Sequence, residues 1–159
     1  MSVQQWQQQS EKAFQETQSL LELWRRHGEE RLQLGEAFHN SGNLFRHFHH
    51  RLRLIKQEIF LGVLLDSKPR YLGEQLITLG FLNRSLVHPR EVFAQAAEQR
   101  AAALVYLHNL PSGDLELSSE DHKVKQRLKG PGQVLSIPLL DHLVICEERY
   151  VSFADEGLL

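Results

Sequence analysis

Short apolar runs alternate with amphipathic segments from residue 58 to the end of the chain. Residues 59–65 and 101–107 are near-continuous apolar runs of strand length, which is typical of strands buried on both faces. A turn over residues 66–69 leads to a second expected strand at residues 70–79. Two or three short strands then complete the chain through Val151 and Phe153.

Helices are expected between these strands. Pro89 fits the first turn of a helix that runs to about Arg100. Ser118 or Ser119 is a suitable cap for a helix that reaches about Lys129, and the Gly-Pro-Gly sequence at 130–132 is expected to end it. Strands that alternate with helices predict an α/β or α+β sandwich.

The first part of the chain has a different pattern. Residues 1 to about 40 are polar and helical, with one apolar stripe at spacings of 3, 4 and 7 formed by Trp6, Ala13, Phe14, Leu20, Leu21 and Trp24. This stripe predicts a helix that packs on the domain or on a second copy of it, giving a homodimer, or an arm that binds a protein partner. The break at residues 40–43 divides the chain into an N-terminal helical extension (1–42) and a main domain (43–159).

A basic segment follows the break. A helix is expected over residues 44–56, with arginine, lysine and histidine side chains and no acidic residue: Arg46, Arg51, Arg53, Lys56, His47, His49 and His50. Without a nearby carboxylate or cysteine, the three histidines favour a solvated basic face over a metal site. Weak contact with phosphate or with an acidic partner is the functional alternative.

Composition narrows the class of protein. The 159 residues suffice for one domain, and 42% hydrophobic with 24% charged residues is ordinary for a globular protein. No apolar run approaches the roughly 20 residues of a membrane span, so no membrane association is expected. The single cysteine, Cys146, fits a reducing cytoplasm. A net charge of −2 gives no support for nucleic acid as the main ligand.

Candidate chemistry gathers where the second long apolar strand ends. His108 leaves that strand, and Asp121 lies near the start of the next helix, at the kind of sheet edge where ligands bind in α/β proteins. A catalytic zinc has three protein ligands and an open position for water, whose pKa it lowers to about 7. The chain offers Glu58 as the base that takes the water proton and Ser118 as the donor that stabilises a substrate oxyanion.

Several segments carry a family resemblance over roughly residues 43–159. They are residues 58–60 with 65–66, 87–91, 107–109 with 111–114, Ser118 with Asp121, 139–142, and 150–154 with Gly157. In these segments the chain resembles the MPN/JAMM (JAB) metallopeptidase-like domain of RadC-type bacterial proteins (UPF0758/RadC family). The resemblance implies a cytidine-deaminase-like α/β/α sandwich, here with an extra N-terminal helical segment. It also implies a zinc site in which His108 and Asp121 are two of three ligands, Glu58 is the general base and Ser118 stabilises the oxyanion.

The chain departs from the family pattern at one ligand. The family motif reads H-x-H-P, then six residues, then S-x-x-D, and Leu110 stands at the second histidine. Leucine cannot coordinate zinc, so weak or absent zinc occupancy is expected. Asn109, Asp114 and His122 are nearby substitutes, although His122 points about 100° away from Asp121 on a helix. Residues 1–42 also lack the helix-hairpin-helix that accompanies many RadC-type proteins.

Three other residues have structural interpretations. His88 is expected at the end of a loop before a helix. The pair Asp141-His142 matches the family and is expected in the core more than in catalysis. Cys146 is expected to be a small buried hydrophobe.

Three functions remain open on this sequence. The first is a degenerate zinc metallohydrolase that acts as a binding or assembly module. The second is an active zinc-dependent hydrolase of peptide or isopeptide bonds that uses a substitute ligand. The third is an accessory protein associated with DNA repair. Its only support is the association of RadC-type proteins with DNA and the basic segment at residues 46–56.

Overall fold

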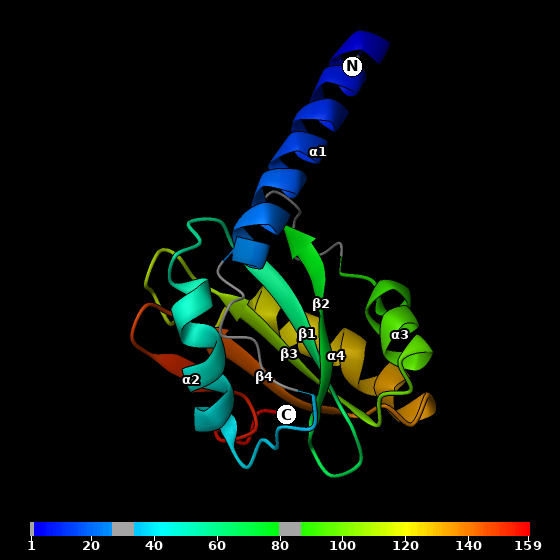
Figure 1. The fold of residues 1–159 in the computed structure, drawn as a ribbon, viewed down its shortest axis with the longest axis vertical. Coiled ribbons are helices and arrows are strands. Elements are labelled where there is room, and N and C mark those ends of the chain that lie inside the picture. The colour runs from blue at the N-terminus through cyan, green and yellow to red at the C-terminus, as the bar shows by residue number, and fades with distance from the viewer. Residues whose placement is uncertain (1, 27–33, 80–86) are drawn as a thin grey trace. The chain divides into compact units, whose positions relative to one another are not determined.

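The computed structural model describes residues 2–26, 34–79 and 87–159, and the chain divides into two compact units, Met1–Arg31 and Leu32–Leu159. The first unit contains helix α1 (Val3–Arg26), on which Trp6 is 60% exposed (Figure 1). The side chains of the other stripe residues, Ala13, Phe14, Leu20, Leu21 and Trp24, lie outside the described ones. Docking or dimerisation through this helix therefore stays a prediction.

The second unit is a mixed five-stranded sheet in the order β2-β1-β3-β4-β5. Its strands are β1 (Ile59–Leu65), β2 (Tyr71–Leu79), β3 (Ala103–Asn109), β4 (Leu139–Ile145) and β5 (Tyr150–Ser152). Only β3 and β4 pair in parallel among these strands; β1 pairs antiparallel with β2 and β3, and β5 pairs antiparallel with β4. All seven residues of β1 and of β3 are buried, as predicted for strands covered on both faces, although β3 begins and ends two residues after the apolar run at 101–107.

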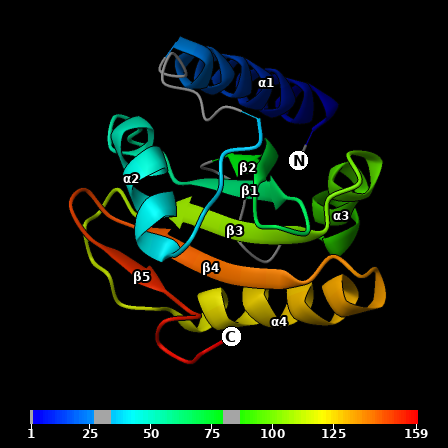
Figure 2. The ribbon, with the colours of Figure 1, turned by 60° about the horizontal axis from the view of Figure 1, so that its bottom comes forward.

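Helices cover both faces of the sheet (Figures 1 and 2). Helix α2 (Ser41–Leu52) lies on one face, and α3 (Pro89–Glu98) and α4 (Ser119–Val134) lie on the other; these are called the α2 face and the α4 face. The core on the α4 face joins Phe60, Leu104 and Tyr106 of the sheet to Phe93 of α3 and Leu128 of α4. The predicted α/β/α arrangement is confirmed.

The start of α2 and its basic residues differ from expectation. Asn40 caps the helix by accepting a hydrogen bond from the Asn43 amide at 2.9 Å, so α2 begins three residues before Leu44. A solvated basic face is wrong at Arg51, which is only 5% exposed and forms a two-pronged ion pair with Glu74 at 2.6 and 3.1 Å. This pair ties α2 to β2.

Helix α4 continues past the expected stop at residues 130–132 and ends at Val134. Burial of Val124 and Leu128 anchors the helix to the core before Pro131, so the proline costs a hydrogen bond without ending it. Gly132 is required because an added Cβ would lie 2.7 Å from the Ile137 carbonyl oxygen, where the chain returns towards β4. None of the helices in the described ranges is both long and apolar enough to cross a membrane.

Candidate metal centre

Three buried side chains converge on the α4 face of the sheet: His108, Asp121 and His142. One ligand-type atom from each lies within 4.8 Å of the other two. His108 Nδ1 is 3.0 Å from His142 Nε2, a hydrogen bond between the two imidazoles, and His108 Nε2 is 3.3 Å from Asp121 Oδ1. The exposed fractions are 0%, 1% and 0%, so water reaches none of the three freely.

The register of the parallel strands brings the two histidines together. His142 of β4 pairs with Tyr106 of β3, two residues before His108. Since side chains alternate between the faces of a strand, Tyr106, His108 and His142 all project to the α4 face. The two imidazoles are therefore diagonal neighbours on adjacent strands.

Asp121 is fixed by the first turn of α4. Its backbone amide donates to the Ser118 hydroxyl at 3.2 Å, and its Oδ2 accepts from the Ser118 amide and hydroxyl, both at 2.9 Å. This is a capping box, in which side chain and backbone of the two residues bond reciprocally. The free N–H groups and the dipole at the helix start also favour the carboxylate. Oδ2 is thus held by Ser118, while Oδ1 faces His108.

Aromatic rings enclose the cluster. The Phe60 ring centroid lies 4.9 Å from that of His108, and Phe153 stacks on His142 at 4.5 Å. Tyr106 meets the His142 ring edge-on at 4.9 Å. An apolar shell of this kind restricts solvent access and fixes the orientation of the imidazoles.

The two residues expected to be catalytic lie near the cluster but outside its three donors. Ser118 directs its hydroxyl to Asp121 Oδ2. Glu58 is half-buried just before β1, two residues before Phe60, whose register partner is His108. Glu58 itself precedes the strand, so extending the alternation of β1 by one residue predicts, but does not observe, that it lies on the same side of the sheet as His108. The roles of general base and oxyanion donor stay predictions.

The expected substitutes for the missing ligand do not belong to the cluster. Asn109 projects to the opposite face, Asp114 is exposed in the loop after β3, and His122 is half-buried with its ring 5.3 Å from that of Phe153. Leu110 is half-buried, and its amide donates to the Ile145 carbonyl at 2.8 Å.

Polar side chains on the α2 face are bonded mainly to the backbone. The Asn109 amide accepts from Ile59 N at 2.6 Å and donates to the carbonyls of Ile55 and Gln57 at 3.4 and 2.9 Å. Asp141 Oδ1 accepts from His142 N and Ala154 N, and its Oδ2 accepts from the Ser152 hydroxyl at 2.6 Å. Burial raises the pKa of the Asp141 carboxyl, although these hydrogen bonds oppose the rise.

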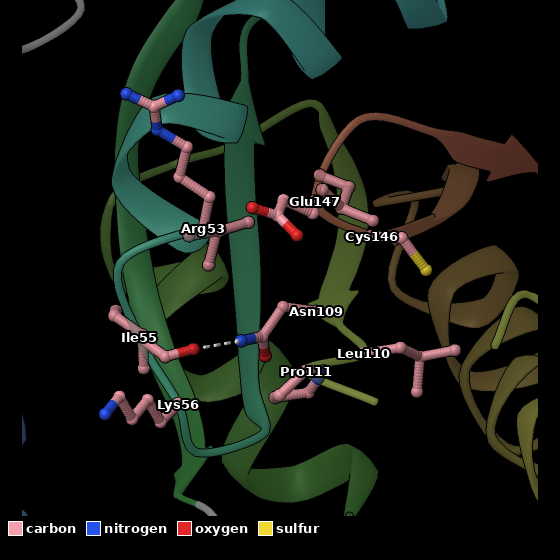
Figure 3. Close-up of a pocket in the computed structure, with 10 residues that line it drawn as sticks. Arg53, Ile55, Lys56, Asn109, Leu110, Pro111, Cys146 and Glu147 are labelled. Atoms are coloured by element: carbon pink, nitrogen blue, oxygen red, sulfur yellow. Dashed lines mark hydrogen bonds between the residues drawn. The ribbon is translucent and has the colours of Figure 1, made fainter. Parts of the chain in front are cut away.

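A pocket of about 280 Å³ lies at the carboxyl ends of β3 and β4 (Figure 3). It is lined by Leu52, Arg53, Ile55, Lys56, Asn109, Leu110, Pro111, Ile145, Cys146 and Glu147. Figure 3 shows the Arg53 guanidinium pointing away from the other lining residues and the Asn109 amide turned to the Ile55 carbonyl. Burial raises the pKa of the Cys146 thiol, with the Arg149 charge acting against it, as expected for a small buried hydrophobe.

The sequence placed His108 and Asp121 in one site and gave His142 a core role. A usable signal was present, because His142 lies in a matched segment on a strand that follows the helix carrying Asp121. A strand-helix-strand unit returns to the same sheet in parallel, beside the strand it left. What the pattern did not give is the register, which decides that His142 and not Leu143 faces the helix.

The donor set suits zinc. Two imidazoles and one carboxylate are a common set of protein ligands for this metal. At Zn–N and Zn–O distances of about 2.0–2.2 Å, tetrahedral donors lie roughly 3.4 Å apart. The 3.3 Å between His108 Nε2 and Asp121 Oδ1 matches this spacing, and the other pairs, none wider than 4.8 Å, would have to close by at most about 1.4 Å. The 3.0 Å contact with His142 is made by the other His108 nitrogen, Nδ1, and a ring binds one ion through one nitrogen only. The residues present therefore fit the group that the resemblance implies.

Comparison with known proteins agrees with this architecture. The RadC-like JAB domain model matches residues 38–158. Proteins described as UPF0758 are similar: one from Syntrophotalea carbinolica is 46% identical over 144 residues, covering 91% of this chain and 63% of the relative. One from Trichlorobacter lovleyi is 44% identical over 137 residues (86% and 60%), and one from Methanosarcina acetivorans 44% over 109 residues (69% and 48%). The chain thus spans between 48% and 63% of the length of these relatives. It belongs to the RadC-like JAB domain family.

Proposed function

We propose that this chain is a RadC-like JAB domain without hydrolytic activity that serves as a binding or assembly module. The observation that carries the proposal is the burial of the whole donor set, with exposed fractions of 0–1%. Hydrolysis needs a metal-activated water that meets the substrate, hence an open coordination position. Zinc, when bound, would supply an acidified water and a Lewis acid, but this shell of aromatic rings leaves a substrate no direct approach.

Two further features support the loss of activity. Leu110 stands where the family motif has its second histidine, so a ligand beside the strand end is missing. The Ser118 hydroxyl donates to Asp121, and a hydroxyl committed in this way is not directed at a substrate oxyanion.

The binding role has a candidate location. The pocket between β3, β4 and the segment after α2 lies at the carboxyl ends of two parallel strands, where ligands bind in open α/β sheets. Its volume of about 280 Å³ is just below the range of small-molecule sites, so it suits one side chain or a small group of a partner.

The experiment is an assay of the full chain, with and without added zinc, on a fluorogenic peptide library and an isopeptide-linked lysine peptide. We expect wild type to show the same background rate as Glu58→Gln and Asp121→Ala. Turnover that a chelator abolishes and that Glu58→Gln removes would contradict the proposal.

An active zinc hydrolase is the second candidate, because His142 supplies a third donor to His108 and Asp121. In that case Glu58 would accept the water proton, as the family resemblance implies. The same assay distinguishes the two candidates, since only the hydrolase depends on Glu58.

The association with DNA repair is left with less support. Arg51, one of the basic residues on which it rested, is paired with Glu74, and His47 lies 3.1 Å from a Glu36 carboxylate oxygen. Exposed cations remain at Arg46, Arg53 and Lys56, too few to give an acidic chain the basic stripe of a duplex-binding surface.

A further inference from the structure

We infer that His142 takes over as the third ligand in this chain, so that His108, Asp121 and His142 hold one buried zinc ion. The proposal goes beyond the proposed function, because it concerns what the buried cluster binds and not what the domain binds. In the family motif the two imidazoles stand two residues apart on one strand. Here the second imidazole comes from the adjacent strand.

Strand geometry makes the exchange possible. Residue 110 follows His108 in the same chain segment. His142 instead lies on the neighbouring strand, β4. His142 lies on the α4 face of β4, whereas residue 110 lies just beyond the end of β3. His142 is fixed by the β3–β4 pairing, so its approach to His108 does not depend on residue 110.

The chemistry of the donors favours a metal. Imidazole nitrogens and a carboxylate oxygen gather within 4.8 Å, with His108–Asp121 already at the spacing of tetrahedral ligands. Ferrous iron also uses two histidines and a carboxylate, but in sites that keep open positions for reactants. Complete burial of the three donors argues against an iron site that admits reactants and favours zinc.

Surrounding residues support each ligand. Ser118 holds Asp121 Oδ2 with two hydrogen bonds and leaves Oδ1 directed at His108. Phe153 stacks on His142 and restricts rotation of its ring. Outer contacts of this kind orient ligands before the metal arrives and raise its affinity.

The alternative is a metal-free cluster in which one imidazole donates to the other across 3.0 Å. Such a cluster would stabilise the sheet without any ion. The two possibilities differ in zinc stoichiometry and in the response of the melting temperature to zinc.

The experiment measures zinc binding to the full chain after removal of metal, by competition with a chromophoric chelator, and repeats it with Co²⁺, whose visible spectrum reports four-coordinate geometry. We expect close to one zinc per chain and a melting temperature that rises with added zinc. His142→Ala and His142→Gln should each weaken zinc binding by more than about 100-fold, since loss of a ligand costs more than loss of an outer contact. Circular dichroism establishes that each variant is folded. If the cavity left by His142→Ala unfolds the domain, His142→Gln, which fills more of that space, provides the measurement.

His122→Ala is the matched control, because His122 follows Asp121 directly yet lies outside the cluster. Its dissociation constant for zinc should equal that of wild type. Substoichiometric zinc in wild type, or a folded His142 variant that binds as tightly as wild type, would overturn the proposal. If the chain binds zinc but hydrolyses nothing, the proposed function is also supported. If it hydrolyses substrate with zinc bound to His142, the proposed function is rejected but the zinc site is retained.

Discussion

The two faces of strands β3 and β4 carry polar side chains that are neighbours in sequence but differ in their partners. On the α2 face, Asn109 and Asp141 bond chiefly to backbone amides and carbonyls. On the α4 face, His108 contacts both His142 and Asp121. A side chain that is hydrogen-bonded to the backbone cannot move away without leaving backbone N–H or C=O groups unsatisfied. A cluster of ligand-type side chains can instead replace its internal contacts with bonds to an ion. The first set of side chains stabilises the fold, and the second is suited to holding an ion.

The largest effect should come from the α2 face. Asn109→Ala removes the partners of one buried amide and two carbonyls, and an unsatisfied buried group costs about 1–3 kcal/mol. We expect the free energy of unfolding of the zinc-free chain to fall by about 3 kcal/mol or more in urea denaturation. A loss below about 1 kcal/mol would break the contrast between the two faces.

The next effect tests the ligand position that the family motif places at residue 110. Leu110→His places an imidazole two residues from His108, where the family motif has one. We expect zinc affinity to rise by about tenfold or more, which equals about 1.4 kcal/mol, in the chelator competition assay. Leu110→Asn, which offers no imidazole at the same position, is the control. An unchanged affinity would mean that residue 110 no longer points to the cluster.

A smaller effect is expected at the helix cap that holds Asp121. Ser118→Ala removes a hydroxyl that both accepts from and donates to Asp121, so stability should fall by about 1 kcal/mol. Zinc affinity should fall about tenfold, because the carboxylate loses an orienting contact. Ser119→Ala, at an exposed position one residue on, should change neither quantity. Equal effects from both variants would show that the cap does not position the ligand.

The smallest effect concerns Cys146, which comes directly after the end of β4 and does not belong to the cluster. Burial raises the pKa of its thiol above the ordinary value near 9.0, so the folded state resists forming the thiolate. A raised pKa means that this group stabilises the fold below pH 9 and that the contribution is lost as the pH rises through the raised value. Relative to Cys146→Ser, wild type should therefore lose stability at alkaline pH. Iodoacetamide should react more slowly with the native chain than with the urea-unfolded chain, and zinc should not alter the native rate. Protection by zinc would place the thiol in the site.

The sequence predicted the fold well where the pattern was local. Residues 59–65 were expected as a strand and form β1, because a continuous apolar run at a strand's length has few other solutions. Helix α4 was expected to end near Lys129 but continues to Val134, because packing of Leu128 in the core outweighs the breaker residues.

The site was only half predictable. His108 and Asp121 come from a motif written within fourteen consecutive residues, and the structure brings them together. His142 lies 34 positions from His108, and its place depends on the register of a parallel pair. Register is set by packing across the whole sheet and leaves no local signal in the sequence.

The most direct test of the account is anomalous diffraction at the zinc edge from crystals of the full chain grown with zinc. We expect a single strong peak within about 2.0–2.2 Å of a nitrogen of His108, a nitrogen of His142 and an oxygen of Asp121. The account would be contradicted by an ion that is bound without His142. It would also be contradicted if zinc occupied other sites and no peak appeared on the α4 face.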